Sequence, residues 1–127
     1  MSEARLEHAY LSVTDLDRSL SFYRRILPDW VIRWEGRSEG GRWIHYGPPG
    51  DGQPGYLSLA EQPEAGPFAP YASLGPQHIG FAHPDVDGLI ARLRPAIQAD
   101  DYVDDGAYRR VYFSDPDGIE LEFVQKL

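Results

Sequence analysis

The sequence predicts an α+β fold in which two tandem βαβββ units form a curved, eight-stranded cavity that resembles a half-barrel. Three observations lead to this fold class. His8, Asp15 and Asp17 each meet an identical residue 70 positions later, so the chain contains an internal repeat. Each copy starts with a period of two residues and then changes to a helical period. Clusters of turn residues separate the apolar stretches that follow each helix.

The first copy is expected over about residues 6–61. Its opening strand alternates apolar and polar residues from His8 to Val13. Thr14, three residues before Asp17, resembles a capping box, and Pro28 is expected to end the helix. Three strands are expected near residues 30–35, 42–46 and 56–60. The apolar face of the helix consists of Leu16, Leu20, Tyr23 and Leu27.

The second copy is expected over about residues 77–126. Val86, Ile90 and Leu93 give its helix an apolar face. Strands are expected near residues 101–103, 109–114 and 119–125. A linker rich in Pro and Gly joins the copies from about Gln62 to Gln77. Because 127 residues suffice for one hydrophobic core, the chain is predicted to be a single domain over residues 1–127.

Composition excludes several classes of protein. The chain has no cysteine, so disulfides and thiolate metal sites are excluded. Its net charge of −8 argues against nucleic-acid binding, which needs a basic surface. Neither a signal peptide nor an apolar segment long enough for a membrane span is recognisable, so we expect no membrane partner and a cytoplasmic location.

Alternation along the strands predicts which residues share a face of each sheet. The apolar residues of each strand must face the helix, which leaves the other face to the polar residues. If the sheets curve, this polar face lines a cavity. Its expected members are His8, Tyr10, Ser12, Tyr56, Ser58, His78, Gly80, Arg110, Tyr112, Ser114, Glu120 and Glu122.

Three residues of this polar face are candidate metal ligands. His8, His78 and Glu122 come from three different strands. Two imidazoles and one carboxylate can hold a divalent ion and leave positions open for a substrate. Taken singly, each is more often structural, since a strand histidine is usually hydrogen-bonded and neutral. Their occurrence on one face, with both histidines at matching positions of the repeat, favours the metal site.

These residues resemble the vicinal-oxygen-chelate superfamily, which includes glyoxalase I, type I extradiol dioxygenases, fosfomycin-resistance thioltransferases and bleomycin-resistance proteins. The resemblance runs from Glu7 to Gln125. It implies that His8, His78 and Glu122 bind one divalent ion per site, which would be Fe, Mn, Ni, Co or Zn. Its strongest segments are His8 with Asp15-Leu-Asp-Arg-Ser-Leu-Ser-Phe-Tyr, His78-Ile-Gly-Phe-Ala, and Tyr112-Phe-Ser-Asp-Pro-Asp-Gly-Ile-Glu-Leu-Glu122.

The chain departs from individual members of that superfamily. Glyoxalase I has a fourth ligand, Glu or Gln, where this chain has Ser58. Tyr112 matches a tyrosine of the extradiol dioxygenases, but no histidine lies between His45 and His78 to match their acid–base histidine. Asp115-Pro-Asp-Gly118 is interpreted as a type I turn, and neither aspartate is expected to touch the metal.

The resemblance implies a metal-dependent enzyme that binds a small substrate through two neighbouring oxygens. Either Lewis-acid lyase, isomerase or transferase chemistry or dioxygenase chemistry would follow, depending on the metal. Tyr112, Arg110 and Tyr10 are candidates for positioning the substrate or moving protons. Tyr56, Ser58 and Glu120 are candidates for substrate binding. The tryptophans Trp30, Trp34 and Trp43 are interpreted as edge-strand and interface residues rather than as a stacking cage.

The alternative is a protein that sequesters a small molecule without catalysis. Bleomycin-resistance proteins resemble this pattern and bind a drug without metal, but they typically lack the three ligands. Small members of the superfamily usually form homodimers. That arrangement would bring His8 from one subunit to His78 and Glu122 of the other.

Overall fold

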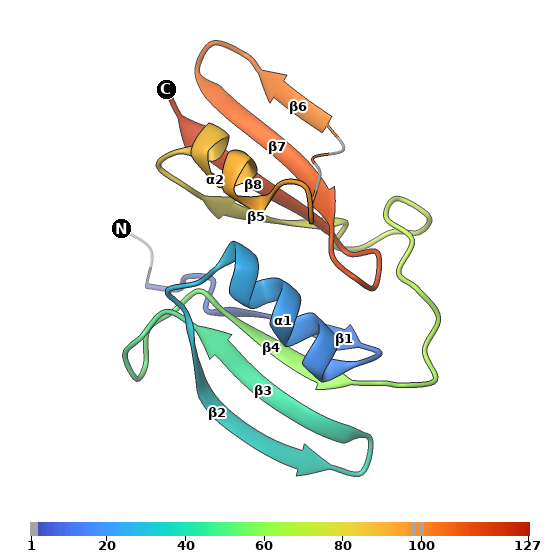
Figure 1. Cartoon of the computed structure of the whole chain (residues 1–127). Coiled ribbons are helices and arrows are strands. Elements are labelled where there is room, and N and C mark those ends of the chain that lie inside the picture. Colours follow the sequence, from blue (N-terminus) through green and yellow to red (C-terminus); the bar gives the residue numbers. More distant parts are fainter. Residues whose placement is uncertain (1–2, 98, 100) are drawn as a thin grey trace. The chain divides into compact units, whose positions relative to one another are not determined.

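Each copy of the repeat folds into a four-stranded sheet with one helix on one face, as the computed structural model shows (Figure 1). The structure describes residues 3–97, 99 and 101–127. It divides into two compact units, Met1–Gly66 (unit 1) and Pro67–Leu127 (unit 2). The predicted fold class, α+β with two tandem βαβββ units, is confirmed. That the units form one domain around a common cavity stays a prediction.

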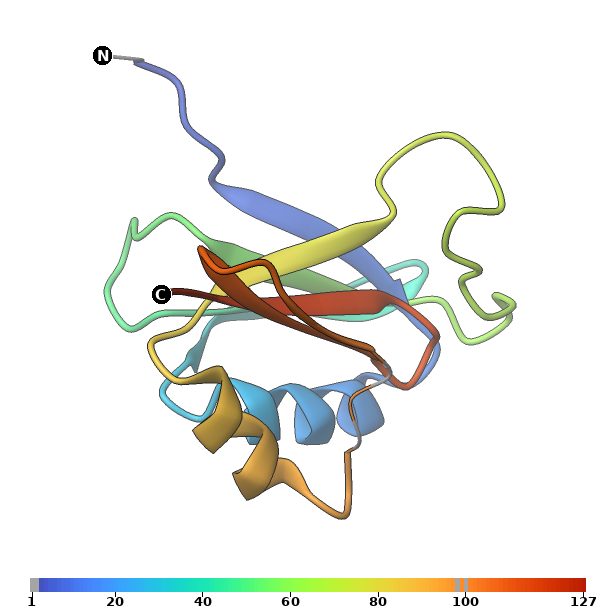
Figure 2. The same ribbon diagram turned by 90° about the horizontal axis from the view of Figure 1, so that it is seen from above.

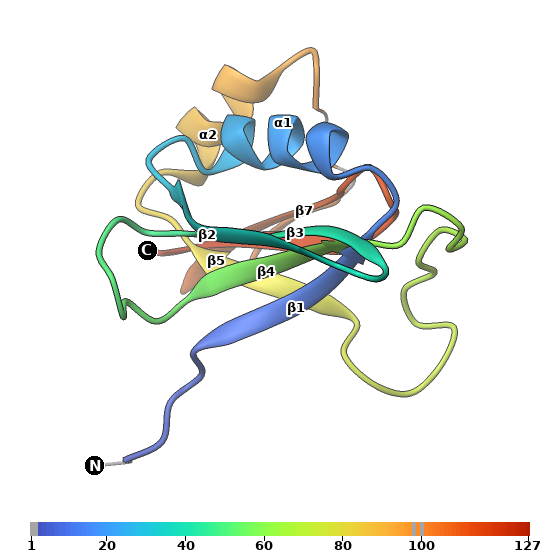
Figure 3. The same ribbon diagram turned by 90° about the horizontal axis from the view of Figure 1, so that it is seen from below.

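Unit 1 has the sheet order β1-β4-β3-β2. Strand β1 pairs in parallel with β4, and the other pairings are antiparallel. Helix α1 lies against one face of this sheet, and no helix from residues 3–66 covers the other face (Figure 3). The elements are β1 (His8–Val13), α1 (Leu16–Ile26), β2 (Val31–Ser38), β3 (Gly41–Gly47) and β4 (Tyr56–Glu61).

Unit 2 repeats this topology with the order β5-β8-β7-β6. Its helix α2 also lies on one face of its sheet (gold against red in Figure 2). Each predicted strand and helix is present, with ends that differ by at most three residues from the sequence pattern. The elements are β5 (His78–Ala82), α2 (Val86–Leu93), β6 (Asp101–Asp104), β7 (Tyr108–Ser114) and β8 (Glu120–Lys126).

The aspartates of the repeat begin the two helices. The Asp15 carboxylate accepts a hydrogen bond from the Arg18 backbone N–H at 3.1 Å, and the Asp85 carboxylate accepts one from Gly88 at 3.0 Å. The predicted capping role of Thr14 is therefore wrong by one residue. The Thr14 hydroxyl accepts instead from the Arg18 guanidinium at 2.8 Å.

The second pair of matched aspartates ties each helix to its sheet. In unit 1, Asp17 pairs with Arg42 of β3 at 3.1 Å. In unit 2, Asp87 pairs with Arg109 of β7 at 2.9 Å. The matched Asp residues are thus part of the scaffold, whereas the matched histidines lie on the open faces of the sheets.

The apolar core of each unit lies between its helix and its sheet, on the face that strand alternation predicted. Leu59 in unit 1 and Leu121 and Phe123 in unit 2 are fully buried. Burial of such side chains contributes about 1.5–3 kcal/mol each relative to exposure. Within the described residues, neither helix is long and apolar enough to cross a membrane.

The turn at Asp115–Gly118 joins β7 to β8. The Gly118 N–H donates to the Asp115 carbonyl at 3.1 Å, which is the bond of a β-turn. The Asp115 carboxylate accepts from the N–H groups of Asp117 and Ile119, each at 2.9 Å. Both aspartates are buried, and these backbone hydrogen bonds give Asp115 a structural role within the turn.

Candidate functional site

The polar face of unit 2 is ionic. His78 of β5 lies opposite Glu120 of β8 in the sheet register, and Glu122 of β8 lies opposite Tyr112 of β7. Side chains that are paired across neighbouring strands project to the same side. The register therefore gathers these four side chains, together with Arg110 of β7, on the face that α2 does not cover.

Both nitrogens of the His78 ring meet a carboxylate. Nδ1 lies 3.3 Å from Glu120 Oε1, and Nε2 lies 3.1 Å from Glu122 Oε1. A neutral imidazole has one N–H, so it can donate to only one of these carboxylates. The other nitrogen then presents a lone pair to an anion, an arrangement that a metal cation between them would stabilise.

Arg110 holds the other oxygen of Glu122. Its Nε lies 3.3 Å from Glu122 Oε2, and its Nη1 pairs with Asp105 at 2.5 Å. Because both ends of the guanidinium are engaged, its orientation on the sheet is fixed. The Glu122 side chain is 11% exposed, so its charge is poorly hydrated and depends on these partners.

Tyr112 completes this face of unit 2. Its ring meets His78 edge-on, with 5.9 Å between the ring centroids. Burial raises the pKa of the Tyr112 hydroxyl above its ordinary value, and the charge of Glu122 raises it further. A hydrogen bond with the Glu122 carboxylate raises this pKa as well, so the hydroxyl is protonated at neutral pH and its proton is directed to Glu122.

His78 and Glu122 fit the donor set of a divalent metal. Metal–ligand bonds of about 2.1 Å at the right angles of octahedral coordination place neighbouring donor atoms about 3.0 Å apart. The 3.1 Å between His78 Nε2 and Glu122 Oε1 matches that spacing. Across the described part of the chain, no group of three or more His, Asp or Glu is arranged to hold a metal ion. The third predicted ligand, His8, belongs to unit 1, so the complete ligand set stays a prediction.

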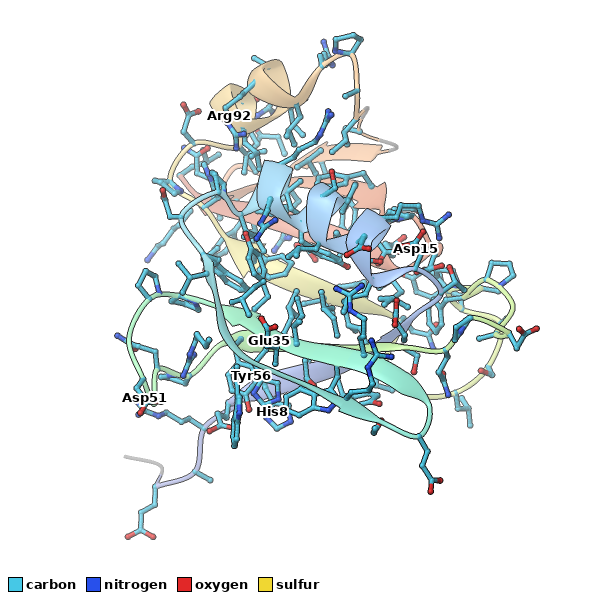
Figure 4. All side chains as sticks on the ribbon, turned by 60° about the horizontal axis from the view of Figure 1, so that its bottom comes forward. His8, Asp15, Glu35, Asp51, Tyr56 and Arg92 are labelled. Atoms are coloured by element: carbon cyan, nitrogen blue, oxygen red, sulfur yellow. The ribbon has the colours of Figure 1, made fainter. Side chains whose placement is uncertain are left out.

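His8 is oriented by its neighbours in unit 1. Its Nδ1 lies 2.9 Å from Glu7 Oε1. Its ring stacks on Tyr56, with 5.0 Å between centroids and 14° between planes. Figure 4 shows His8 and Tyr56 side by side. Because Glu7 engages Nδ1, Nε2 is the nitrogen through which His8 would bind a metal.

The polar face of unit 1 is aromatic rather than ionic. Centroid distances from 4.8 to 6.0 Å join its rings in one series, which we call the aromatic strip. The interpretation of Trp34 and Trp43 as edge-strand and interface residues rather than a stacking cage stays a prediction. Strand β2, which carries Trp34, is an edge strand, and both indole rings make edge-on or tilted contacts rather than stacked ones. The strip consists of His8, Tyr56, His45, Trp43 and Trp34.

A pocket of about 690 Å³ opens beside the aromatic strip. The Arg33 guanidinium lies 5.0 Å from the Tyr56 ring centroid, within cation–π distance. Burial lowers the pKa of His45, and the charges of His8 and Arg33 lower it further, so the His45 ring is neutral at pH 7. The pocket is lined by Glu7, Arg33, Trp34, His45, Tyr56 and residues 50–52.

The remaining predicted site residues lie on the polar face of unit 1. Tyr10 of β1 is paired in register with Ser58 of β4 and is 64% exposed, whereas Ser58 is buried. Within unit 1 the structure brings His8 and Tyr56 into contact. Within unit 2 it brings together five predicted residues, which are His78, Arg110, Tyr112, Glu120 and Glu122.

Sequence reasoning missed His45, which it did not assign to either face of the sheet. The signal was present, because His45 stands between Ile44 and Tyr46, and both of these are buried. Alternation then places His45 on the open face. Tyr71 of the linker was also missed, and its hydroxyl contacts Glu120 and His78.

Comparisons with known proteins agree with this geometry. The model of the Glyoxalase/Bleomycin resistance protein/Dioxygenase superfamily matches residues 5–123. A glyoxylase/bleomycin resistance protein/dioxygenase domain from Frankia sp. EAN1pec superposes with a TM-score of 0.82 at 27% identity, covering 99% of this chain and 94% of that one. Glyoxalase I from Leishmania major has a TM-score of 0.76 at 25% identity, covering 97% and 87%.

A third similar structure is TnmS3, an antibiotic binding protein from Streptomyces sp. CB03234. Its TM-score is 0.72 at 21% identity, and the match covers 100% of this chain and 99% of that one. At this identity the likeness concerns the fold alone. No curated protein matches the chain.

Proposed function

Because the chain belongs to the glyoxalase/bleomycin resistance protein/dioxygenase superfamily, we propose that it is a divalent-metal-dependent enzyme that binds a small substrate through two neighbouring oxygens. The proposed ligands are His8, His78 and Glu122. The observation that carries the proposal is the spacing of 3.1 Å between His78 Nε2 and Glu122 Oε1 on an open, polar sheet face.

The charges around His78 support a cation at this position. Glu120 and Glu122 contact the two ring nitrogens, and Arg110 offsets part of the charge of Glu122. A cation between Nε2 and Glu122 would relieve the repulsion between a lone pair and an anion. When bound, a divalent ion would supply Lewis-acid chemistry to the substrate oxygens, or dioxygen chemistry in the case of iron.

The other residues of the polar faces would bind and orient the substrate. Arg110, anchored by Asp105, holds Glu122 in place. The protonated Tyr112 hydroxyl would turn its hydrogen bond from Glu122 to a substrate oxygen as negative charge develops there. We assign Tyr10, Tyr56, Ser58 and Glu120 to contacts with the substrate, because their strand positions place them on the same faces as the proposed ligands.

The four histidines of the chain provide a matched test. Protein purified without chelators should contain about one divalent ion per chain by elemental analysis, and H8A and H78A should lose it. H45A and H83A should keep it, because His83 Nδ1 accepts from the Asp85 backbone at 2.9 Å and takes no part in the proposed site. Full metal content in H78A, or a wild type that refuses added Fe, Mn, Ni, Co and Zn, would overturn the proposal.

The proposed homodimer has its own test, in which H8A is mixed with H78A. If His8 meets His78 and Glu122 of the partner subunit, each variant alone lacks an intact site, but a mixed dimer regains one. Metal binding should then recover in the mixture. No recovery after confirmed subunit exchange would mean that all three ligands come from one chain or that the site does not exist.

We also propose a cytoplasmic location and no nucleic-acid or membrane partner.

The aromatic strip favours a second candidate function, sequestration of a planar aromatic compound without catalysis. The aromatic rings of Trp34, His45 and Tyr56, which line a pocket of about 690 Å³, offer such a ligand a large contact area. Metal-free protein should then bind planar aromatic compounds and show quenched tryptophan fluorescence. Y56A should weaken this binding at least tenfold, and Y108F in unit 2 should leave it unchanged. Equal binding by Y56A and wild type would contradict this function.

A further inference from the structure

Tyr71 in the linker has an unusual backbone conformation. Its φ is 66°, and no other described residue except glycines has a positive φ. This region costs an L-residue roughly 1–2 kcal/mol, and such conformations concentrate at functional sites. An observed outlier of this kind calls for an explanation from the contacts that its side chain makes.

The surrounding loop holds Tyr71 in that conformation. The Tyr71 N–H donates to Gln77 Oε1, and Gln77 Nε2 donates to the carbonyls of Ser73 at 2.6 Å and Gly75 at 2.9 Å. Earlier in the linker, the Phe68 N–H donates to the Asp117 carbonyl at 2.8 Å. The segment is therefore fixed to unit 2 on one side of Tyr71 and closed by Gln77 on the other.

The strained backbone directs the Tyr71 hydroxyl to His78 and Glu120. It donates to Glu120 Oε1 at 2.5 Å and lies 3.3 Å from His78 Nδ1. Since a phenol has one proton and Tyr71 gives it to the carboxylate, the Tyr71 oxygen presents only lone pairs to His78. Glu120 Oε1 also presents lone pairs, at 3.3 Å from the same nitrogen.

Two acceptors thus face His78 Nδ1, and this nitrogen can make a hydrogen bond with them only when it carries the proton. In the neutral ring, Nε2 then carries the lone pair and faces Glu122. A histidine that binds metal needs this state, with one nitrogen free to coordinate and the other N–H held by a carboxylate.

We propose that Tyr71 and Glu120 are positioning residues that hold the proton of His78 on Nδ1 and turn Nε2 toward the metal position. The metal-binding part of this proposal rests on the proposed function. The tautomer part concerns contacts within unit 2 and is measurable without any metal.

The first test is the tautomer of His78 in the metal-free protein. Nitrogen-15 NMR at about pH 9, where an ordinary imidazole is neutral, should show the wild-type proton on Nδ1. Y71F and E120A should each shift population toward the tautomer with the proton on Nε2, which can donate to Glu122. Y108F, a matched Tyr→Phe change in the same unit, should give the wild-type spectrum. A wild-type proton on Nε2, or Y71F indistinguishable from Y108F, would overturn the proposal.

The second test is metal affinity by equilibrium dialysis with Co²⁺. Removal of groups that support a metal-binding histidine typically weakens binding 10–100-fold. Y71F should lie near the lower end of this range, because Tyr71 is 64% exposed. Y71F/E120A should bind no more weakly than E120A alone, since both residues act on the same nitrogen. If the losses of Co²⁺ affinity in Y71F and E120A were additive in the double variant, the two residues would not act on the same nitrogen. Expected NMR shifts with no Co²⁺ binding in the wild type would support the positioning role and reject the proposed function.

Discussion

The two units share a scaffold but present opposite kinds of chemistry on their open faces. Asp15 and Asp85 begin the helices in the same way, and Asp17 and Asp87 each pair with an arginine of the sheet. The open face of unit 1 nevertheless carries the aromatic strip. The open face of unit 2 carries a series of polar and ion-pairing side chains, which are Asp105, Arg110, Glu122, His78 and Glu120.

This difference shows how a repeat can keep its fold while its two copies diverge in chemistry. Successive strand residues point to opposite sides of a sheet. Changes such as Ser58 in unit 1 against Glu122 in unit 2 therefore affect the open face without disturbing the core on the helix side. The contacts that anchor the helices lie on that second side, and they occur in both units.

The largest difference in stability between the units should come from their glycine turns. Gly118 has φ +88° and a Cβ there would lie 2.5 Å from the Phe68 carbonyl oxygen, whereas Gly52 has φ +78° and open space around it. G118A should lower the free energy of unfolding by about 3 kcal/mol and G52A by about 1 kcal/mol. Urea denaturation measures both, and equal losses would show that the Phe68 contact does not constrain the turn.

The helix caps should test whether the shared scaffold is equally important in the two units. D15A and D85A each remove one carboxylate that accepts a backbone N–H at a helix start. Each should cost about 1 kcal/mol in the free energy of unfolding. T14A is the control for α1 and should cost less than D15A. A larger loss for T14A would reinstate Thr14 as the cap.

A smaller change in stability, in the stabilising direction, is expected at a position where the two helices differ. Ser19 of α1 occupies the place that Leu89 has in α2, and its buried hydroxyl has no hydrogen-bond partner among the described residues. An unsatisfied buried polar group is unfavourable. S19A should therefore stabilise the protein by roughly 0.5–1 kcal/mol, seen as a higher melting temperature. A lower melting temperature would mean that the hydroxyl has a partner in solution.

The smallest effect on stability is expected from Asp105, which lies between β6 and β7 of unit 2. Hydrogen bonds from the backbone of Tyr108, the Arg110 side chain and the backbone of Ala107 lower the pKa of Asp105 to about 2. Because the folded pKa lies below the unfolded value near 3.9, the stabilisation is present above about pH 4 and is lost as pH falls toward 2. The stability difference between wild type and D105N should shrink over that window. A difference independent of pH would contradict the shift.

The sequence predicted the parts of the molecule that depend on periodic patterns. Strand alternation placed His78 and Glu122 on the open face of unit 2, and the repeat identified both helices. The same alternation, applied to Ile44 and Tyr46, would have placed His45 correctly. The predicted cap of α1 was wrong by one residue, because Thr14 and Asp15 both have cap-forming side chains and only the backbone conformation decides between them.

Tyr71 could not be found in this way. Its position depends on contacts between the linker and the Asp115–Gly118 turn, and these residues have no common period in the sequence. The linker was identified from its Pro and Gly content, which predicts irregular structure but not the atoms that it will contact. The hydroxyl beside His78 is therefore a product of tertiary structure.

The proposed function requires the ionic face of unit 2 to bind a divalent cation. The aromatic face of unit 1 should bind no such cation when unit 2 does not. The most direct test is an anomalous difference map from crystals grown with Co²⁺. One strong peak should lie about 2.1 Å from both His78 Nε2 and Glu122 Oε1. No peak at that position, or a peak on His45 or Glu7 alone, would contradict the claim.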